Sequence, residues 1–268
     1  MLFESIFIVR GGFWGEEYDF KLLFAIVALC ICIIDWKWKG RKDYFCVYIT
    51  SFLFWSSVEL AINLMGIREM PHRFLFGMEI PIWLSIPLQG LAEGTTVGIM
   101  ALFITDLYIN EETRKYSVLV LGIVVITISL IMFSHGIYTP NIGGDVPGRR
   151  DVFPIWELLI IPLVSPAIYW LIKTDKDTRK RGLYMFLIMF FLGCAWYFVY
   201  WLSGQRWVEI GTKNPDGTYS NLRRAPPIIE LMVILYNAFV EIALIYLPFL
   251  AIPYLLGLIK QVEDESSI

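Results

Sequence analysis

The sequence predicts an all-α, polytopic membrane protein built as a seven-transmembrane-helix bundle, and three observations favour this class. Hydrophobic residues make up 57% of the 268 residues and charged residues only 18%, whereas soluble domains have about 25% charged residues. The mean hydropathy is +0.62. The apolar stretches are continuous rather than alternating, which argues against transmembrane β-strands. A soluble enzyme, a disordered chain and a secreted disulfide scaffold are therefore excluded.

Seven stretches qualify as spans of a hydrocarbon core about 30 Å thick. The last is long enough to tilt, or to kink at Pro248 or Pro253. The seven stretches cover residues 21–36, 44–66, 81–108, 116–138, 154–173, 182–204 and 227–259. We therefore expect a single transmembrane domain over residues 21–260.

The two ends of the chain are expected to lie outside this domain. Residues 1–20 lack the basic region and the small-residue cleavage site of a signal peptide. We expect them to form an interfacial segment, as a helix broken at Gly11 and Gly12. Residues 261–268 form a short acidic tail, which we expect to be solvated.

Basic residues in the connections predict the orientation of the bundle. Residues 35–43 hold four lysines or arginines and residues 173–181 hold five, whereas residues 136–153 hold two. These counts favour an N-terminus outside and a C-terminus in the cytoplasm, against the four basic residues of 205–226. In that last connection, Asn214-Pro-Asp-Gly217 is a turn signal that predicts a short outer hairpin between helices 6 and 7.

Cysteine and histidine usage limits the chemistry. The four cysteines lie in apolar stretches without a CxxC pair, which is typical of buried free thiols. His72 and His135 are the only histidines, too few for a di-haem cytochrome, a di-iron desaturase or a HExxH zinc protease. We expect neither a metal nor a cofactor. The net charge of −3 gives no footprint for nucleic acid.

Carboxylates inside the apolar stretches are the main indication of function, because an ionisable residue at membrane depth is costly. Glu59, Glu93 and Glu241 lie mid-span in the second, third and seventh stretches, and we hypothesise that they are catalytic. No lysine or arginine lies at comparable depth in a span, so desolvation is expected to favour their neutral forms. Acids nearer to span ends, which helix-end roles explain better, are Asp106, Glu157 and Glu230.

Polar residues recur four positions from these acids, so that each acid shares a helix face with amides or aromatics. Such stripes are expected to face inward and to line a central cavity. They are also typical of structural contacts between helices. Aromatic residues deep in the sixth stretch can line a pocket or stabilise a cation. The residues expected to bind a substrate are Trp55, Asn63, Gln89, Tyr197, Trp201 and Asn237.

Gly90, Gly94 and Gly98 form a ridge of small residues on the third stretch. Such a ridge lets two helices approach closely. It predicts packing, and it offers a face for an oligomer or a partner.

Two motifs carry a resemblance to a known family. A neutral acid in a dry, aromatic-lined pocket can protonate an alkene or epoxide, and a second carboxylate can take a proton back. Phe54-Trp-Ser-Ser-Val-Glu-Leu60 and Asn237-Ala-Phe-Val-Glu-Ile242, with the chain length and span count, resemble the seven-helix integral-membrane terpene cyclases of meroterpenoid pathways. The resemblance implies Glu59 and Glu241 as catalytic acids. The chain departs from that family in two ways: Trp55 lies four residues before Glu59 rather than directly before it, and the late acid is Glu rather than Asp.

We favour an integral-membrane enzyme, a cyclase-like isomerase or lyase, acting on a lipophilic, prenyl- or terpenoid-type substrate. Membrane lipids and this small molecule are the expected partners, with no nucleic acid. One alternative is a transporter or channel whose mid-span carboxylates carry protons or cations, although seven spans do not divide into equal inverted halves. Another is a non-catalytic sensor or complex subunit that docks through residues 205–226.

Overall fold

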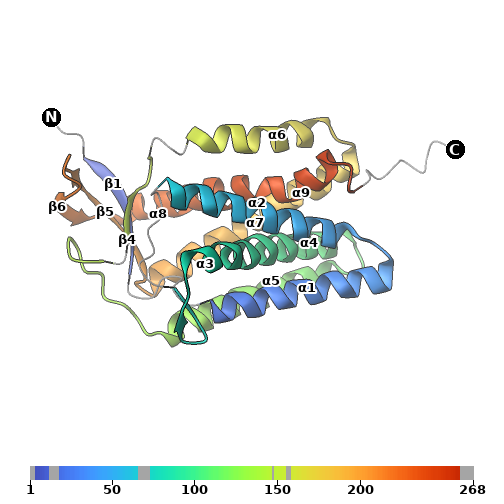
Figure 1. Ribbon diagram of the computed structural model, residues 1–268, viewed down its shortest axis with the longest axis horizontal. Coiled ribbons are helices and arrows are strands. Elements are labelled where there is room, and N and C mark those ends of the chain that lie inside the picture. The colour runs from blue at the N-terminus through green and yellow to red at the C-terminus, as the bar shows by residue number, and fades with distance from the viewer. Residues whose placement is uncertain (1–3, 12–17, 66–72, 147, 155–157, 260–268) are drawn as a thin grey trace.

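The computed structural model describes residues 4–11, 18–65, 73–146, 148–154 and 158–259. The protein is mostly helical, at 69%. Seven helical segments lie alongside one another, and a small β-sheet covers one end of the bundle (Figure 1). His72, Glu157 and the tail 261–268 lie outside the described residues.

Each predicted apolar stretch contains one continuous helical segment. Five of these segments are uninterrupted α-helices: α1 (Asp19–Lys39), α2 (Asp43–Leu64), α5 (Arg114–Ser134), α6 (Ile160–Lys173) and α7 (Lys176–Leu202). The other two each hold a π-helical section between two α-helices. They are α3 (Ile82–Gln89), η1 (Gly90–Thr95) and α4 (Thr96–Ile109), and then α8 (Pro227–Asn237), η3 (Ala238–Leu244) and α9 (Ile245–Leu255).

Five segments are long and apolar enough to cross a membrane: α2, α3 through α4, α5, α7, and α8 through α9. In α5 the mean hydropathy reaches 2.6 while only 11% of the apolar window is buried, so its exposed face is suited to lipid rather than water. The apolar helix α6 has only 14 residues, and α1 carries charged residues near both ends. These helices support a membrane protein.

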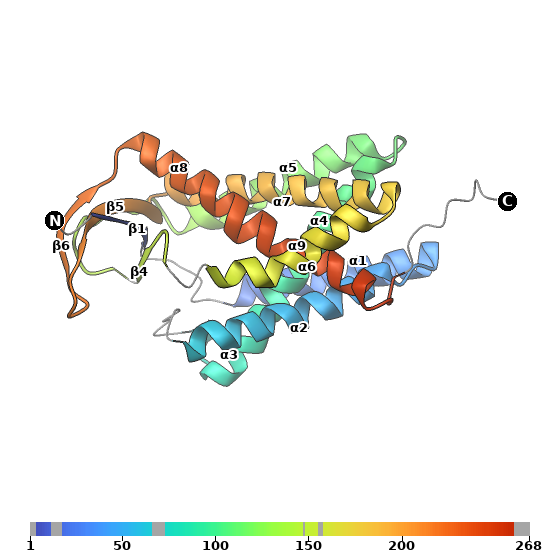
Figure 2. The ribbon, with the colours of Figure 1, turned by 90° about the horizontal axis from the view of Figure 1, so that it is seen from above.

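A four-stranded antiparallel sheet caps one end of the bundle in the order β4-β1-β5-β6 (Figure 2). Its strands are β1 (Ser5–Arg10), β4 (Gly148–Asp151), β5 (Arg206–Lys213) and β6 (Tyr219–Arg224). The turn at 214–217 joins β5 to β6, with Gly217 at φ +84°. A separate pair, β2 (Phe74–Leu75) and β3 (Met78–Glu79), precedes α3.

The expectation of an interfacial helix near the N-terminus is wrong for Ser5–Arg10. This segment contains the run Ile6 to Val9, which is rich in β-branched and aromatic side chains that suit a strand. Ser5 pairs with Gly211 on one side, and Phe7 pairs with Asp151 on the other. The hairpin of β5 and β6 is therefore one edge of a larger sheet.

The glycine ridge is covered within the chain. A Cβ atom added to Gly94 would lie 2.5 Å from the carbonyl oxygen of Ser51, and one added to Gly90 would lie 1.9 Å from Oγ of Ser56. Only glycine allows α2 to approach this closely. The ridge that offered a face for an oligomer or partner thus packs against α2 of the same chain.

An ion-paired cluster ties the helices together at the end opposite the sheet. Arg181 on α7 binds both oxygens of Asp106 on α4, each at 2.8 Å, and Asp43 on α2 at 3.0 Å. Tyr44 donates a further hydrogen bond of 3.0 Å to Asp106. Asp106 therefore has a structural role at a helix end.

Candidate functional site

Two of the three mid-span acids lie in π-helical sections. Glu93 is in η1 and Glu241 is in η3. Prolines contribute to this backbone geometry: Pro248 has no N–H to donate to the carbonyl of Leu244, the last residue of η3. π-Helical turns are rare and are frequently found at functional sites. Their π-helical backbone thus distinguishes Glu93 and Glu241 from Glu59, which lies in a regular α-helix.

Glu241 is held by one helix and by the sheet. The Tyr197 hydroxyl on α7 donates a hydrogen bond of 2.8 Å to its Oε2, and Arg150 of β4 forms an ion pair with its Oε1. Arg206 of β5 lies over the Tyr197 ring, with its guanidinium carbon 4.4 Å from the ring centroid. The sheet therefore places two cations, Arg150 and Arg206, close to the Glu241 carboxylate and its tyrosine partner.

Glu93 has a different environment. The Trp55 indole donates a hydrogen bond of 3.1 Å to its Oε2, and Trp55 stacks on Tyr246 at 5.0 Å between centroids. Within the described part of the chain, Glu93 makes no ion pair. Glu93 is thus bound by a neutral donor, whereas Glu241 is paired with a cation.

Arg206 is a cation in a dry position beneath the sheet. Its side chain is only 5% exposed. Burial lowers the pKa of its guanidinium, and the nearby Tyr197 and Glu241 oppose that effect. An arginine nonetheless stays protonated in proteins. A buried charge is costly unless neighbours compensate it. Tyr197 and Glu241 are neighbours that compensate the charge of Arg206.

Glu59 belongs to another cluster. It is fully buried, accepts a hydrogen bond of 3.0 Å from Asn63, and lies 3.7 Å from a guanidinium nitrogen of Arg73. Arg73 also donates to Ser85 on α3. Among the described residues, no hydrogen bond or ion pair joins Glu59 to Glu93 or Glu241. These contacts tie α2 to α3 and to the connection before it.

The other predicted binding residues fall in different places. Gln89 is buried and accepts a hydrogen bond of 3.2 Å from Lys21 on α1. Trp201 donates a hydrogen bond of 2.7 Å to Glu230. Asn237 is completely buried one turn before Glu241, and neither polar atom of its amide has a partner among the described residues. Burying such a group unpaired costs about 1–3 kcal/mol, which is typical of a position kept for a ligand or a water.

The expectation that the mid-span acids have no cationic partner is wrong for Glu59 and Glu241, whereas Glu93 makes no ion pair in the described part of the chain. Arg73, Arg150 and Arg224 pair with Glu59, Glu241 and Glu230 respectively. None of these arginines lies in an apolar stretch, so the composition of the spans alone does not predict them. The sequence signal for them is the β-branched and aromatic run in Ser5–Arg10, which is typical of a strand. Pairing with this strand places 148–151 and 206–213 at the end of the helices.

No protein-family model matches the chain, and no curated protein or solved structure matches it. The geometry of the site is therefore the basis for its function.

Proposed function

We propose that the protein is an integral-membrane enzyme that converts a lipophilic, prenyl- or terpenoid-type substrate by acid–base chemistry at Glu93 and Glu241. The observation that carries the proposal is that both acids lie in π-helical sections and in unlike surroundings, Glu93 beside a neutral indole and Glu241 beside a cation and a hydroxyl. Two carboxylates in unlike surroundings can divide the roles of acid and base.

Glu93 acts as the acid. A neutral indole, not a cation, binds its carboxyl group, so the group can carry a proton and give it to an alkene carbon or an epoxide oxygen. Glu241 acts as the base, because Arg150 and Tyr197 support its ionised form. It takes a proton from the cationic intermediate, so one proton enters, one leaves and the product is an isomer.

Aromatic rings would stabilise the cation formed between these two steps. Trp55 and Tyr246 stack next to Glu93. Tyr197 and Tyr200, three residues apart, are both buried on α7. Their ring faces carry partial negative charge and attract cations without reacting with them. This arrangement keeps the resemblance to the integral-membrane terpene cyclases at Glu241. It moves the acid from Glu59, which Arg73 neutralises, to Glu93.

We further propose that all seven helical segments lie in the membrane, with the sheet outside and the C-terminus in the cytoplasm. The basic residues of 35–43 and 173–181 then face the cytoplasm together, as the positive-inside rule expects. Replacing the lysines of these two connections by arginine should leave the orientation unchanged, because lysine and arginine count alike in this rule.

The test uses the full chain in liposomes of total host lipid, prepared in D₂O with geranylgeraniol or its terminal epoxide. We expect products that carry one deuterium on carbon, or isomers of unchanged mass with a new retention time in liquid chromatography–mass spectrometry. Glu93→Gln and Glu241→Gln are each expected to slow conversion at least about 100-fold. Glu111→Gln is the matched control, because its side chain is 89% exposed. Unchanged conversion in both acid variants would overturn the proposal.

A proton- or cation-coupled transporter is the second candidate. It is favoured by ion pairs at both ends of the bundle, Asp106–Arg181 at one and Glu241–Arg150 at the other, because alternating access needs a closure at each end. The same liposomes with a pH-sensitive dye inside provide the test. A pH gradient dissipated by the native chain but not by Glu241→Gln, without lipid conversion, would replace the enzyme with a transporter.

A further inference from the structure

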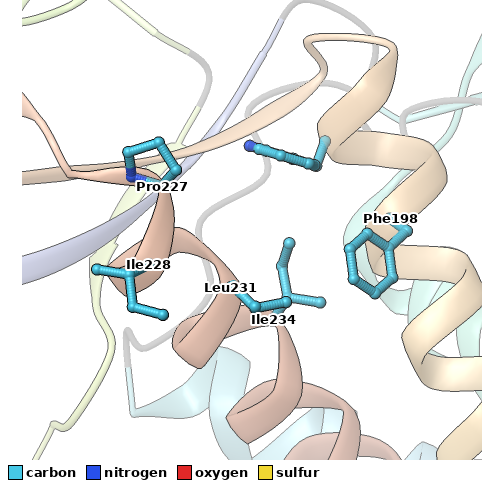
Figure 3. Close-up of a pocket in the computed structure, with 6 residues that line it drawn as sticks. Phe198, Pro227, Ile228, Leu231 and Ile234 are labelled. Atoms are coloured by element: carbon cyan, nitrogen blue, oxygen red, sulfur yellow. The ribbon is translucent and has the colours of Figure 1, made fainter.

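An apolar groove of about 340 Å³ lies between α7 and α8, near the sheet. In Figure 3, Phe198 of α7 faces Leu231 and Ile234 of α8 across this space, and Pro227 and Ile228 stand at the start of α8. Trp201 completes the lining. Almost the whole lining is hydrocarbon or aromatic ring, so water has few polar groups to bind there.

The polar end of this groove is formed around Glu230. The Trp201 indole donates a hydrogen bond of 2.7 Å to Oε2 of Glu230, so the side-chain N–H of this lining residue is already paired. Arg224, three residues before Pro227, donates to Oε1 at 3.0 Å. Glu230 is buried, but the Arg224 side chain is 47% exposed. Arg224 therefore presents a positive charge where the groove meets the sheet.

Part of the Arg224 guanidinium remains available. Its Nε and Nη2 bind Glu230, at 3.0 and 3.4 Å. Its Nη1 makes no hydrogen bond within the described ranges. Guanidinium groups match phosphate oxygens in geometry as well as in charge. An anionic group above the groove would thus find a half-exposed donor already oriented by a buried carboxylate.

We propose that this groove binds one hydrocarbon chain of an anionic phospholipid, with the lipid phosphate at Arg224. Both helices that form the groove belong to segments long and apolar enough to cross a membrane, so lipid chains would surround it. Ile228 is 61% and Leu231 is 38% exposed, so the groove is open to the hydrocarbon that surrounds these helices. Hydrocarbon below and a cation above match the two parts of one phospholipid.

The groove adjoins the candidate site. A second cavity, of about 10 Å³, is lined by Tyr197 and Arg206, and it shares Trp201 and Ile234 with the groove. Trp201 and Ile234 thus separate the groove from the surroundings of Glu241. The lipid site does not depend on the proposed catalysis, because it can be occupied whether or not a reaction follows.

The experiment uses the full chain in nanodiscs with a phosphatidylglycerol that carries a diazirine in one acyl chain. After irradiation, mass spectrometry of the digested protein is expected to locate most crosslinks in 198–201 and 227–234. Leu231→Trp would fill the groove and abolish this labelling. Met232→Trp is the matched control. The Met232 side chain, next to Leu231 in the chain, is 63% exposed and does not line the groove, so this substitution should leave labelling unchanged.

The role of Arg224 is tested with the same probe. Arg224→Gln is expected to lower labelling about tenfold at subsaturating lipid, because the lipid phosphate loses its charged donor. Arg224→Lys, which keeps the charge, should retain most of it, and a diazirine-bearing diacylglycerol should label poorly in every variant. Crosslinks spread evenly over the apolar surface, or equal labelling by both lipids, would overturn the proposal. A labelled groove in a chain that converts no prenyl lipid would overturn only the enzymatic function.

Discussion

The Tyr197 hydroxyl donates a 2.8 Å hydrogen bond to Glu241, across the contact between α7 and the π-helical section η3. Arg150 binds the other oxygen of the same carboxylate. The carboxylate is thereby fixed from two sides by groups of different chemistry. A helix and a β-strand that are far apart in the chain meet at this one side chain.

Tyr197→Phe removes the hydroxyl and keeps the ring below Arg206. We expect the kcat for prenyl lipid conversion to fall about 10- to 100-fold with little change in KM, because a hydrogen bond to a charged group contributes about 1.5–3 kcal/mol. Steady-state kinetics in the liposome assay provide the measurement. Tyr169→Phe, at a side chain 63% exposed on α6, is the control. Equal effects of the two variants would contradict a positioning role for Tyr197.

Trp55→Phe removes the indole N–H that binds Glu93 and leaves an aromatic ring against Tyr246. Loss of one hydrogen bond to a carboxyl group is expected to slow conversion about tenfold. Steady-state kinetics in the liposome assay provide the measurement. Trp38→Phe, at a side chain 82% exposed, should leave kcat unchanged. Equal rates for Trp55→Phe and the native chain would contradict a positioning role of Trp55 toward Glu93.

Asn237→Leu replaces a buried amide that has no partner among the described residues. A side chain of similar volume without polar atoms is expected to raise the free energy of unfolding by about 1–2 kcal/mol. The thermal midpoint in detergent, followed by differential scanning fluorimetry, should therefore rise. Lipid conversion should fall at the same time, if the amide serves the substrate. A variant that is less stable than the native chain would indicate that the amide is already paired.

The sheet region holds a buried ion pair, Glu209 with Arg149, and an exposed ion pair, Glu4 with Arg223. Their effects on stability can be compared. Glu209 is fully buried, lies 2.8 Å from Arg149 and accepts a hydrogen bond of 2.9 Å from Trp207. Glu209→Ala removes the acceptor shared by Arg149, Trp207 and the backbone N–H of Gly143, and is expected to cost about 3–5 kcal/mol of stability. Glu4→Ala breaks an exposed pair with Arg223 and should leave the thermal midpoint unchanged. Similar midpoints for the two variants would show that the sheet does not bury Glu209.

Asp216 in the β5–β6 turn gives a pH-dependent prediction. Hydrogen bonds from the side chain and backbone of Thr218 lower the pKa of this carboxyl group. The resulting stabilisation is present above the ordinary pKa of about 4 and is lost as the pH falls through the lowered value. Thr218→Val should return the pKa toward its ordinary value in a ¹³C NMR titration of the full chain. Ser220→Ala, in the same hairpin, should leave it unchanged.

The positions of the helices could be predicted from the sequence because apolar runs of about 20 residues have few other uses. The bounds of α2 and α5 follow such runs closely, whereas α7 begins at Lys176, inside the charged connection expected at 173–181. The π-helical sections could not be predicted in the same way. Shifting a few hydrogen bonds by one residue leaves the pattern of apolar side chains nearly unchanged, and the prolines at 87 and 248 were the only local signals.

The site was predicted only in part for a related reason. Helical spacing correctly relates residues within one span, such as Asn63 to Glu59, which are hydrogen-bonded. It contains no information on which distant segment covers a carboxylate. Arg150 and Arg206 reach Glu241 and Tyr197 only because β1 aligns β4 and β5, and that pairing joins residues from opposite ends of the chain.

The central place of β1 in the sheet has a consequence for biosynthesis. Ser5–Arg10 leaves the ribosome early, but its partners Gly148–Asp151 and Arg206–Lys213 follow much later. At about 5–20 residues per second, the strand waits roughly 10–40 s for β5. During that time an unpaired apolar strand can pair with other nascent chains. Arg150, which pairs with Glu241, is placed by this sheet, and Glu241 itself is synthesised after β4 and β5, so the chain acquires its complete site only in the final stage of maturation.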